Sequence, residues 1–358
     1  MKGFLKKYID KVFWVSREDS FSVEKLHHKK SKPFSGLKLR FRNELVNQKY
    51  HYDNEHWYHN EMVFLIKEPV WIEPQYGIVI KSGRNIFAPS HQFTDLFPSA
   101  PRFLKAQLQN ENVLEIERAV LFDGALGSNY FHFFSNVLSK LWVLEQYLNL
   151  KETPIIIHQK TYNTKYFQYL LNETSLGEYP WVVQHGRQYI KVKELYFSKP
   201  MPYELAHWSK TQKLLGVIPQ EKEYAKKVFL SRSVKSGRFI ENMEEIIPLL
   251  KEYEIEVVDT NGWTLQQQMA LMQDVSHFIG IHGAGMTNMM LCHNPKLKIL
   301  EINPANRVSC HYYWMANMFG FSYDVLLGSE LPFTNVYPEK GFKVDKDLLS
   351  AHLATLMG

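Results

Sequence analysis

The chain has 358 residues, of which 45% are hydrophobic and 22% charged. Such a composition is typical of a folded globular protein and excludes general disorder, and the length predicts two domains of ordinary size. The formal net charge of +5 is too small an excess to indicate a nucleic-acid-binding protein. The two cysteines, Cys292 and Cys310, lack CxxC spacing, so we expect free thiols and no zinc site.

The N-terminal segment MKGFLKKYIDKVFWV has an amphipathic pattern, without a signal-peptide cleavage site or a long apolar run. As a helix it would gather apolar side chains on one face and lysines largely on the other: Phe4, Leu5, Tyr8, Ile9, Val12 and Phe13 against Lys2, Lys6, Lys7 and Lys11. Over residues 1–20 we therefore expect a helix that either contacts an anionic membrane through residues 1–15 or docks on the protein's own core. We expect a cytoplasmic protein, held peripherally at the inner face of the membrane in the first case.

The next predicted elements are strands. Residues 33–110 contain the short strand-like stretches HWYHNEMVFLI, YGIVI and NIFAP, which predict a β-rich extension. The apolar strand 119–122 then leads into a glycine-containing loop and a long helix over 130–148. A strand at 153–158, a helix at 162–171 and strands at 181–183 and 192–197 complete an α/β domain, which we expect to span residues 21–220.

The second domain, over residues 221–358, follows a polar boundary near 219–222. Its predicted strands end near residues 231, 260, 282, 302 and 326, and its helices cover 240–253, 264–274, 283–291 and the region of Tyr313 to Phe319. Strands that alternate with helices over short connections predict a doubly wound parallel sheet. Ligands bind such sheets at the carboxyl ends of the strands.

One of those strand ends carries the run His282-Gly283-Ala284-Gly285-Met286-Thr287-Asn288. Gly283 and Gly285 allow a sharp turn and a close approach of the backbone to a ligand, and Thr287 and Asn288 favour the start of a helix. The exposed N–H groups and the dipole of a helix N-terminus attract anions, and His282 adds a donor. The turn therefore predicts a phosphate or diphosphate site.

Charged residues lie at the ends of two further strands of the same domain. Arg232, between Ser231 and Ser233, and Arg238 could clamp a diphosphate or a carboxylate, although two surface arginines would have the same pattern. Glu301 ends the strand after the glycine turn and could accept the hydroxyls of a ribose, unless it is an ordinary charge at a strand end.

The first domain offers a second group of candidates, in Asn129-Tyr130-Phe131-His132 and, four residues later, Asn136. His132 lies in the first turn of a helix that follows a strand and a glycine-containing loop, and it is a candidate general base. The alternative is a core histidine between aromatic rings. Asp123 is the reserve candidate, and Asn129, Tyr130 and Asn136 are expected beside an acceptor.

The run IGIHGAGMTNMML, preceded by FLSRSVKSGRFIENMEE and followed by ILEINP, resembles the motif set of glycosyltransferase family 61, and NYFHF resembles its N-terminal motif. The resemblance covers residues 118–327. It implies a GT-B fold, in which two Rossmann-like domains face each other across a cleft, and an inverting transferase that uses a nucleotide sugar, most often a UDP-sugar, without an obligatory metal or cofactor.

Carried over by position, the resemblance implies that the donor diphosphate binds to the glycine turn and the two arginines, and that Glu301 lies near the ribose. The residues that would hold the diphosphate are His282, Gly283, Ala284, Gly285, Thr287 and Asn288, with Arg232 and Arg238. The acceptor would be a surface glycan such as capsule or lipopolysaccharide, free or lipid-linked. Family members often have an acid where this chain has Asn136. Because an amide is no base, this departure favours His132.

Two other interpretations remain open. A nicotinamide-dependent dehydrogenase would explain Gly283, Gly285 and an acid about 20 residues later, but Asn288 stands where the third glycine of that fingerprint belongs. A non-catalytic nucleotide- or glycan-binding protein would explain Asn136. A hydrolase is excluded, since the chain has no G-x-S-x-G nucleophile elbow.

Overall fold

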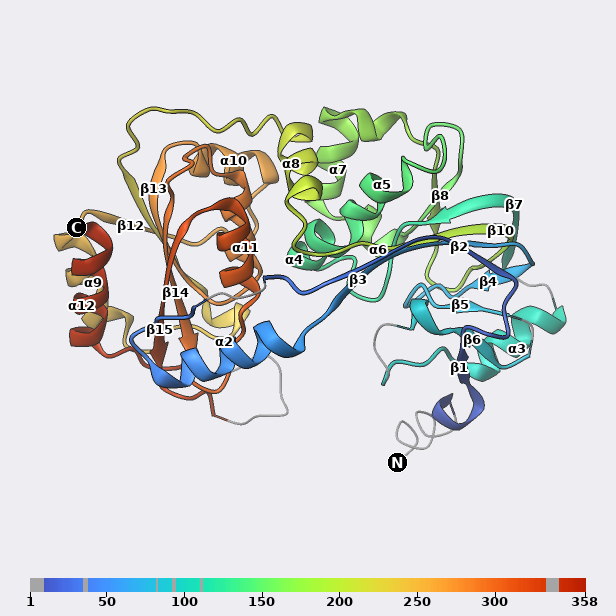
Figure 1. Cartoon of the computed structure of the whole chain (residues 1–358), viewed down its shortest axis with the longest axis horizontal. Helices are drawn as coiled ribbons and strands as arrows, with labels where there is room; N and C mark the ends of the chain where they lie inside the picture. The colour runs from blue at the N-terminus through green and yellow to red at the C-terminus, as the bar shows by residue number, and fades with distance from the viewer. Residues whose placement is uncertain (1–9, 35–37, 82, 92–94, 110–111, 333–340) are drawn as a thin grey trace. The chain divides into compact units, whose positions relative to one another are not determined.

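The computed structural model describes residues 10–34, 38–81, 83–91, 95–109, 112–332 and 341–358 (Figure 1). The chain divides into two compact units, each made of two segments. Unit 1 comprises Met1–Ser31 and Asn60–Pro202, and unit 2 comprises Lys32–His59 and Tyr203–Gly358. This division differs from the expected domains 21–220 and 221–358, because residues 32–59 belong to unit 2 and the later change of unit falls at 202–203.

Unit 2 is built on a five-stranded sheet of described residues, in which all paired strands are parallel. Its strands are β11 (Lys226–Leu230), β12 (Ile255–Val258), β13 (Val275–Ile281), β14 (Lys298–Pro304) and β15 (Ser322–Gly328). The order β12-β11-β13-β14-β15 reverses direction between β11 and β13. A reversal of this kind is where doubly wound sheets bind their ligands. The predicted alternation of strands and helices in this half of the chain is confirmed.

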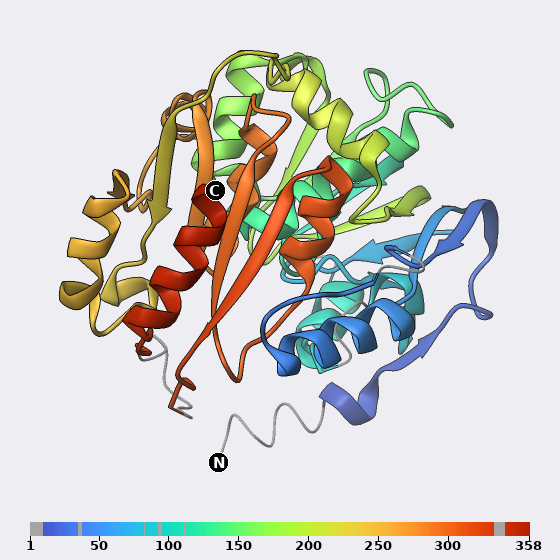
Figure 2. The same ribbon diagram turned by 60° about the vertical axis from the view of Figure 1, so that its left-hand side comes forward.

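The helices of unit 2 (Figure 2) are α8 (Leu205–Leu214), α9 (Met243–Glu252), α10 (Leu265–Met272), α11 (His311–Phe319) and α12 (Lys346–Met357), with the 3₁₀ helices η4 (Val234–Ser236) and η5 (Ala284–Leu291). Thr264 begins α10 with a capping box that includes Gln267, and Gly320 ends α11 in the left-handed conformation, with φ 75°. Pro248 lies inside α9 without ending it.

The expectation of a β-rich extension over residues 33–110 is wrong for its first part. Residues Glu44–His56 form the helix α2, which Asn43 caps by accepting hydrogen bonds from the backbone of Leu45 and Val46. α2 belongs to unit 2, where the buried ring of Tyr50 stacks on Tyr313 with 5.3 Å between ring centroids. The helix is therefore part of the core of unit 2.

Unit 1 contains a ten-stranded sheet of described residues. Its strands are β1 (Val15–Arg17), β2 (Val23–Ser31), β3 (His59–Ile66), β4 (Val70–Ile72), β5 (Val79–Ile80), β6 (Asn85–Phe87), β7 (Val113–Leu121), β8 (Ile155–His158), β9 (Trp181–Gln184) and β10 (Tyr189–Lys199). Strand β10 pairs in parallel with β7 and antiparallel with β3 and β4. The strands β10, β7, β8 and β9 thus form a parallel half of the sheet, extended by antiparallel strands from the earlier part of the chain.

The helices of unit 1 are α3 (Ala100–Gln109), α4 (Tyr130–His132), α5 (Ser139–Leu144), α6 (Gln159–Tyr162) and α7 (Lys165–Glu173), with the short turns η1 (Ala88–Ser90) and η3 (Ser175–Glu178). The predicted helix at 130–148 is three consecutive pieces, because a π-helical segment, η2 (Phe133–Leu138), separates α4 from α5. π-helical turns widen the backbone and are frequent at functional sites.

Of the helix expected over residues 1–20, residues 10–20 lie among the described residues, and the expectation is wrong at 15–17, which form the strand β1. Residues 10–13 are helical, and residues 1–9, with Lys2, Lys6 and Lys7, lie outside the described part. The carboxylate of Asp10 accepts a hydrogen bond from the Ala100 backbone at 2.9 Å, and the indole of the buried Trp14 donates to the Pro98 carbonyl at 2.7 Å. These residues therefore dock on unit 1. In the described part of the chain, no helix is long and apolar enough to cross a membrane.

Candidate functional site

In unit 2, the predicted diphosphate turn lies at the point where the strand order reverses. Arg232 follows β11 and Gly283 follows β13, and a Cβ atom on Gly283 would lie only 1.9 Å from Nη1 of Arg232. The absent side chain is what lets the guanidinium lie against the turn. The loop after β11 holds this guanidinium, since Nε donates to the Gly237 carbonyl at 2.9 Å and Nη2 to the Ser236 carbonyl at 2.7 Å.

The same loop brings a second arginine to the site. Gly237 and Arg238 both have positive φ, 63° and 51°, and a non-glycine residue in this region stores backbone strain that is common at functional sites. Burial raises the pKa of Tyr312, and the positive charges of Arg238 and Arg232 act in the opposite direction on it. Both arginines therefore lie within electrostatic reach of one phenol. Ser233 is occupied within the loop, with its Oγ 3.1 Å from Oγ of Ser236.

Glu301 lies beneath His282 in a chain of side-chain hydrogen bonds. Nδ1 of His282 donates to Oε1 of Glu301, and the Tyr323 hydroxyl donates to Oε2. Tyr50 of α2 continues the chain, with its hydroxyl 3.2 Å from that of Tyr323. Burial and the charge of Glu301 raise the pKa of Tyr323, so its phenol keeps the proton that it donates.

This arrangement favours another role for Glu301 than the expected contact with a ribose. Its side chain is fully buried, and both carboxylate oxygens are engaged by protein groups, whereas a ribose would need an accessible carboxylate. The acid instead fixes the ring of His282 through Nδ1, so that a ligand would be contacted through Nε2. Tyr50 and Tyr323, which sequence reasoning missed, complete the support.

The remaining residues of the motif divide into backbone and core. Gly285 lies against Leu230 of β11, since a Cβ there would lie 2.7 Å from Cδ2 of that leucine. Thr287 and Asn288 are completely buried, and the Asn288 amide donates to Gln268 of α10 at 2.8 Å. The side chains of Thr287 and Asn288 thus anchor η5, which starts at Ala284, and the turn itself presents only His282, Gly283, Ala284 and Gly285 to a ligand.

In unit 1, the structure pairs His132 with Asn136. Nδ2 of Asn136 lies 3.0 Å from Nδ1 of His132, and the Asn129 side chain caps the helix by accepting from the His132 backbone at 3.3 Å. Burial lowers the pKa of His132, which keeps the imidazole neutral near neutral pH. Tyr130 packs between aromatic neighbours, with ring centroids 5.0 Å from Phe134 and 5.4 Å from Tyr166.

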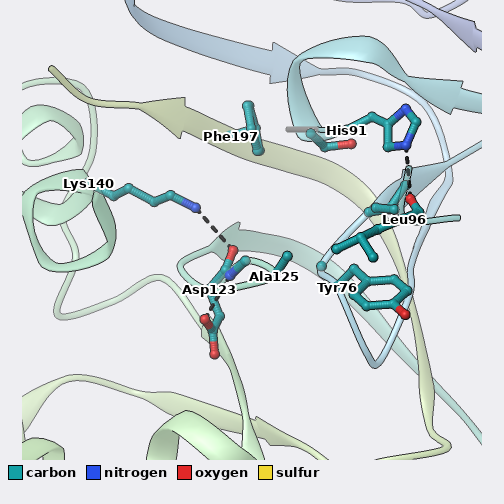
Figure 3. A pocket seen from close by; sticks show the side chains of 11 residues that line it. Tyr76, His91, Leu96, Asp123, Ala125, Lys140 and Phe197 are labelled. Carbon is teal, nitrogen blue, oxygen red and sulfur yellow. Dashed lines mark hydrogen bonds between the residues drawn. The ribbon is translucent and has the colours of Figure 1, made fainter. Parts of the chain in front are cut away.

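The reserve candidate, Asp123, is buried and fully engaged. Its carboxylate accepts from the backbones of Gly124 at 2.7 Å and His158 at 3.1 Å, and Nδ1 of His158 lies 3.4 Å from Oδ2. Lys140 donates to the Asp123 carbonyl at 3.0 Å (Figure 3). A carboxylate so enclosed orients its neighbours and does not reach a substrate. Neither His158 nor Lys140 was singled out from the sequence, since each lies in an apolar or helical stretch far from Asp123 in the chain.

Two cavities of unit 1 meet at Tyr76, Gly124 and Ala125. The one in Figure 3 has about 10 Å³, close to the space of one water molecule, and the ring of His91 in its wall hydrogen-bonds the Leu96 carbonyl at 2.9 Å. The other has about 490 Å³ and follows the ends of β8 and β9. Only the larger one has room for an organic ligand.

The described residues offer no group of three or more histidine, cysteine, aspartate or glutamate side chains that could hold a metal ion. One triplet of DxD form, a pattern that suggests metal binding in a transferase, does occur at Asp345-Lys346-Asp347. Asp345 serves there as the N-cap of α12, accepting from the Leu348 backbone at 2.9 Å. Cys292 and Cys310 are free and buried, as expected.

No curated protein matches the chain. The family model described as Glycosyltransferase 61 matches residues 130–299. The matched range begins at the helix of His132 and includes both arginines and the whole glycine turn. The resemblance carried by these motifs is thereby confirmed, and over residues 130–299 the chain is similar to glycosyltransferase family 61.

Proposed function

We propose that the protein is an inverting glycosyltransferase that moves a sugar from a nucleotide sugar, UDP-linked by the family resemblance, to a surface glycan such as capsule or lipopolysaccharide. The observation that carries this proposal is the contact of the Arg232 guanidinium with Gly283 at the reversal point of a parallel sheet. There a cation, a glycine turn and a helix start converge, and this combination suits a diphosphate.

The donor half would work by electrostatic stabilisation. As the bond between the anomeric carbon and the diphosphate breaks, negative charge grows on the leaving phosphate. Arg232, Arg238 and the backbone N–H groups at the start of η5 would face that charge, and His282, held by Glu301, would contact the same group. The proposal needs no metal or other cofactor, because fixed cations of the protein neutralise the leaving group.

The acceptor half would use His132 as the base. The acceptor hydroxyl attacks the anomeric carbon, its proton passes to Nε2 of His132, and the nucleoside diphosphate leaves with the bonding electrons. This step requires the proton of the neutral ring on Nδ1. Because an amide's oxygen and nitrogen can be exchanged by a flip, Asn136 can accept from Nδ1–H across the 3.0 Å contact. Asn136 is then a positioning residue rather than a base.

The wider setting is part of the same proposal. Each unit has candidate residues at the carboxyl ends of parallel strands, as expected of the two Rossmann-like halves of a GT-B enzyme. A cytoplasmic enzyme whose residues 1–15 contact anionic lipid would meet a lipid-linked glycan acceptor. The docking of Asp10 and Trp14 on unit 1 leaves residues 1–9 as the part to test for lipid contact.

The test is a mass-spectrometric screen of nucleotide sugars for hydrolysis or transfer, combined with calorimetry of UDP binding. His132→Ala should lower turnover by about 10²–10⁴ and leave UDP affinity unchanged, whereas the exposed His185→Ala control should behave as wild type. UDP binding without any turnover would support the non-catalytic alternative. Preference for NAD over UDP would instead refute the transferase.

A further inference from the structure

The helix α2, at the lower edge of unit 2 in Figure 1, carries exposed apolar and aromatic side chains. Leu45 and Tyr52 are 49% and 53% exposed, and Trp57 and Tyr58, which directly follow the helix, are 37% and 52% exposed. Scattered exposed apolar residues need no explanation, but a group of them marks an interaction site. We call these four residues the α2 face.

Lysine side chains lie against the three rings of the α2 face. Lys49 is four residues after Leu45 and three before Tyr52, so the three share one side of the helix. Nζ of Lys49 lies 5.6 Å from the Tyr52 ring centroid and 6.0 Å from that of Trp57. Nζ of Lys32 lies 5.1 Å from the centroid of the third ring, that of Tyr58. Rings and ammonium groups at cation–π distance therefore form one mixed surface.

Further cations directly precede α2. Lys38, Arg40 and Arg42 are exposed, and they alternate along the chain with the less exposed Leu39 and Phe41. Three positive charges thus follow one another on the solvent side of the segment that leads into the helix.

The acids of α2 lie away from the α2 face. Glu44 directly precedes Leu45, so it is turned from it by about 100° around the helix, and Glu55 lies about three turns further along on the side of Glu44. Asp53 is buried, with Lys49 at 2.7 Å. The surface around the α2 face is therefore positive as well as apolar.

We propose that the α2 face binds the surface of an anionic membrane. Tyrosine and tryptophan rings lie at the headgroup level of bilayers, and exposed lysines and arginines attract anionic lipids. The aliphatic Leu45 among these groups favours a lipid over an acidic polysaccharide, since only a bilayer offers an apolar layer beneath its charges. The inference goes beyond the proposed function, because it needs no transferase activity and assigns a lipid contact to unit 2 in addition to residues 1–9.

The first test is co-sedimentation of the full chain with vesicles of equal parts phosphatidylcholine and phosphatidylglycerol. The protein should bind them and not vesicles of phosphatidylcholine alone. Salt should release it, because the Debye length falls from about 10 Å at 0.1 M to about 3 Å at 1 M. The double variant Lys38→Gln, Arg40→Gln should bind at least about tenfold more weakly.

The matched control, Lys213→Gln with Lys251→Gln, removes the same charge from exposed positions of α8 and α9 and should bind as wild type. Equal binding by both double variants, or no binding by the wild type, would overturn the proposal.

The second test asks which side of α2 enters the lipid. Cys292 and Cys310 are buried, so a dye that reports polarity can be attached selectively to an exposed new thiol. The dye on Tyr52→Cys should shift to the blue when the anionic vesicles are added, whereas the dye on the exposed Glu55→Cys should not. No shift at position 52, or equal shifts at both positions, would contradict the proposed contact.

Two further outcomes distinguish other partners. A chain without residues 2–9 should still bind the anionic vesicles, and complete loss of binding would leave the N-terminal segment as the membrane contact in place of α2. Binding of soluble hyaluronate without binding of vesicles would replace the membrane by an acidic glycan. UDP calorimetry reports on the donor site separately, so failure of the α2 proposal leaves the transferase proposal intact.

Discussion

Nδ2 of Asn136, in the π-helical segment η2, lies 3.0 Å from Nδ1 of His132, in the helical turn α4 before it. A neutral amide leaves the imidazole pKa under the control of burial, which lowers it. An acid in place of Asn136 would do the opposite, because a carboxylate stabilises the imidazolium. The residue at this position should therefore set the pH range in which the His132 imidazole is unprotonated.

The first prediction concerns the pH profile of Asn136→Asp. Transfer by the wild type should fall with decreasing pH only below the ordinary histidine value of about 6.5, since the pKa of His132 is lowered by burial. In Asn136→Asp the carboxylate should raise this pKa by about 1–3 units, and the acidic limb of kcat/KM should move up with it. Asn136→Leu serves as the uncharged control. If the acidic limbs of wild type and Asn136→Asp were superimposable, His132 would not be the base of the reaction.

The second prediction concerns Gly283→Ala. The new methyl group would lie where Nη1 of Arg232 now is, since the calculated separation is 1.9 Å. The guanidinium must move, so donor affinity should fall by about 1.5–3 kcal/mol, the range for a charge-assisted hydrogen bond. UDP calorimetry measures this loss.

A double-mutant cycle makes this prediction specific. Arg232→Ala should cost a similar amount, and the double variant should lose little more than either single one, because both changes remove the same contact. Gly186→Ala is the matched control, since nothing lies within 4 Å of a Cβ at that position. Fully additive losses would mean that Gly283 and Arg232 act independently.

The third prediction separates two roles for Glu301. If this buried acid orients His282, Glu301→Gln should weaken UDP and inorganic diphosphate equally, by about 1 kcal/mol. If it instead bound the ribose, only UDP would be weakened. Tyr323→Phe removes the hydroxyl that donates to the other carboxylate oxygen of Glu301. It should also weaken UDP and inorganic diphosphate equally, but by less than Glu301→Gln. Competition binding with the two ligands gives both affinities in one experiment.

The fold of unit 2 could be predicted from the sequence because its central strands β13 and β14 are almost wholly buried and form short apolar runs between turns. The helix α2 could not. Two of its four buried residues, Asp53 and Asn54, are polar, so the inward face carries no apolar pattern. Tertiary partners contact both: the Cys310 thiol donates to the Asp53 carboxylate at 3.4 Å, and the Trp314 indole donates to Asn54.

At the candidate site, too, local motifs could be predicted from the sequence, whereas contacts between distant residues could not. The glycine turn and both arginines are local motifs, and the sequence alone brought them to attention. The Asp123–His158 pair joins residues 35 positions apart through the pairing of β7 with β8, and His158 reads in the sequence as the end of an apolar strand. The role of Glu301 depends on Tyr50, more than two hundred residues earlier in the chain, which only the fold brings to Tyr323.

The last prediction concerns Lys140, which is buried next to Asp123. Burial lowers the pKa of its ammonium group from 10.5 to about 8, and the group donates to the Asp123 carbonyl and lies 5.5 Å from the Phe197 ring centroid. At pH values between the pKa of the folded protein and that of the unfolded chain, the unfolded chain binds the proton that the folded protein has released. Stability should therefore rise with pH across this window, by about 3 kcal/mol for a difference of 2.5 units, and the gain should be lost as the pH falls back through about 8.

Urea denaturation at a series of pH values from about 7 to 10 measures this dependence. Lys140→Met should lack the rise, because it removes the titrating group while keeping an unbranched side chain of similar length. The exposed Lys160→Met is the matched control and should keep the wild-type slope. If wild type and Lys140→Met changed in parallel over the whole range, the ammonium would have the same pKa in the folded and unfolded chains, and the enclosed environment assigned to Asp123 and Lys140 would be wrong.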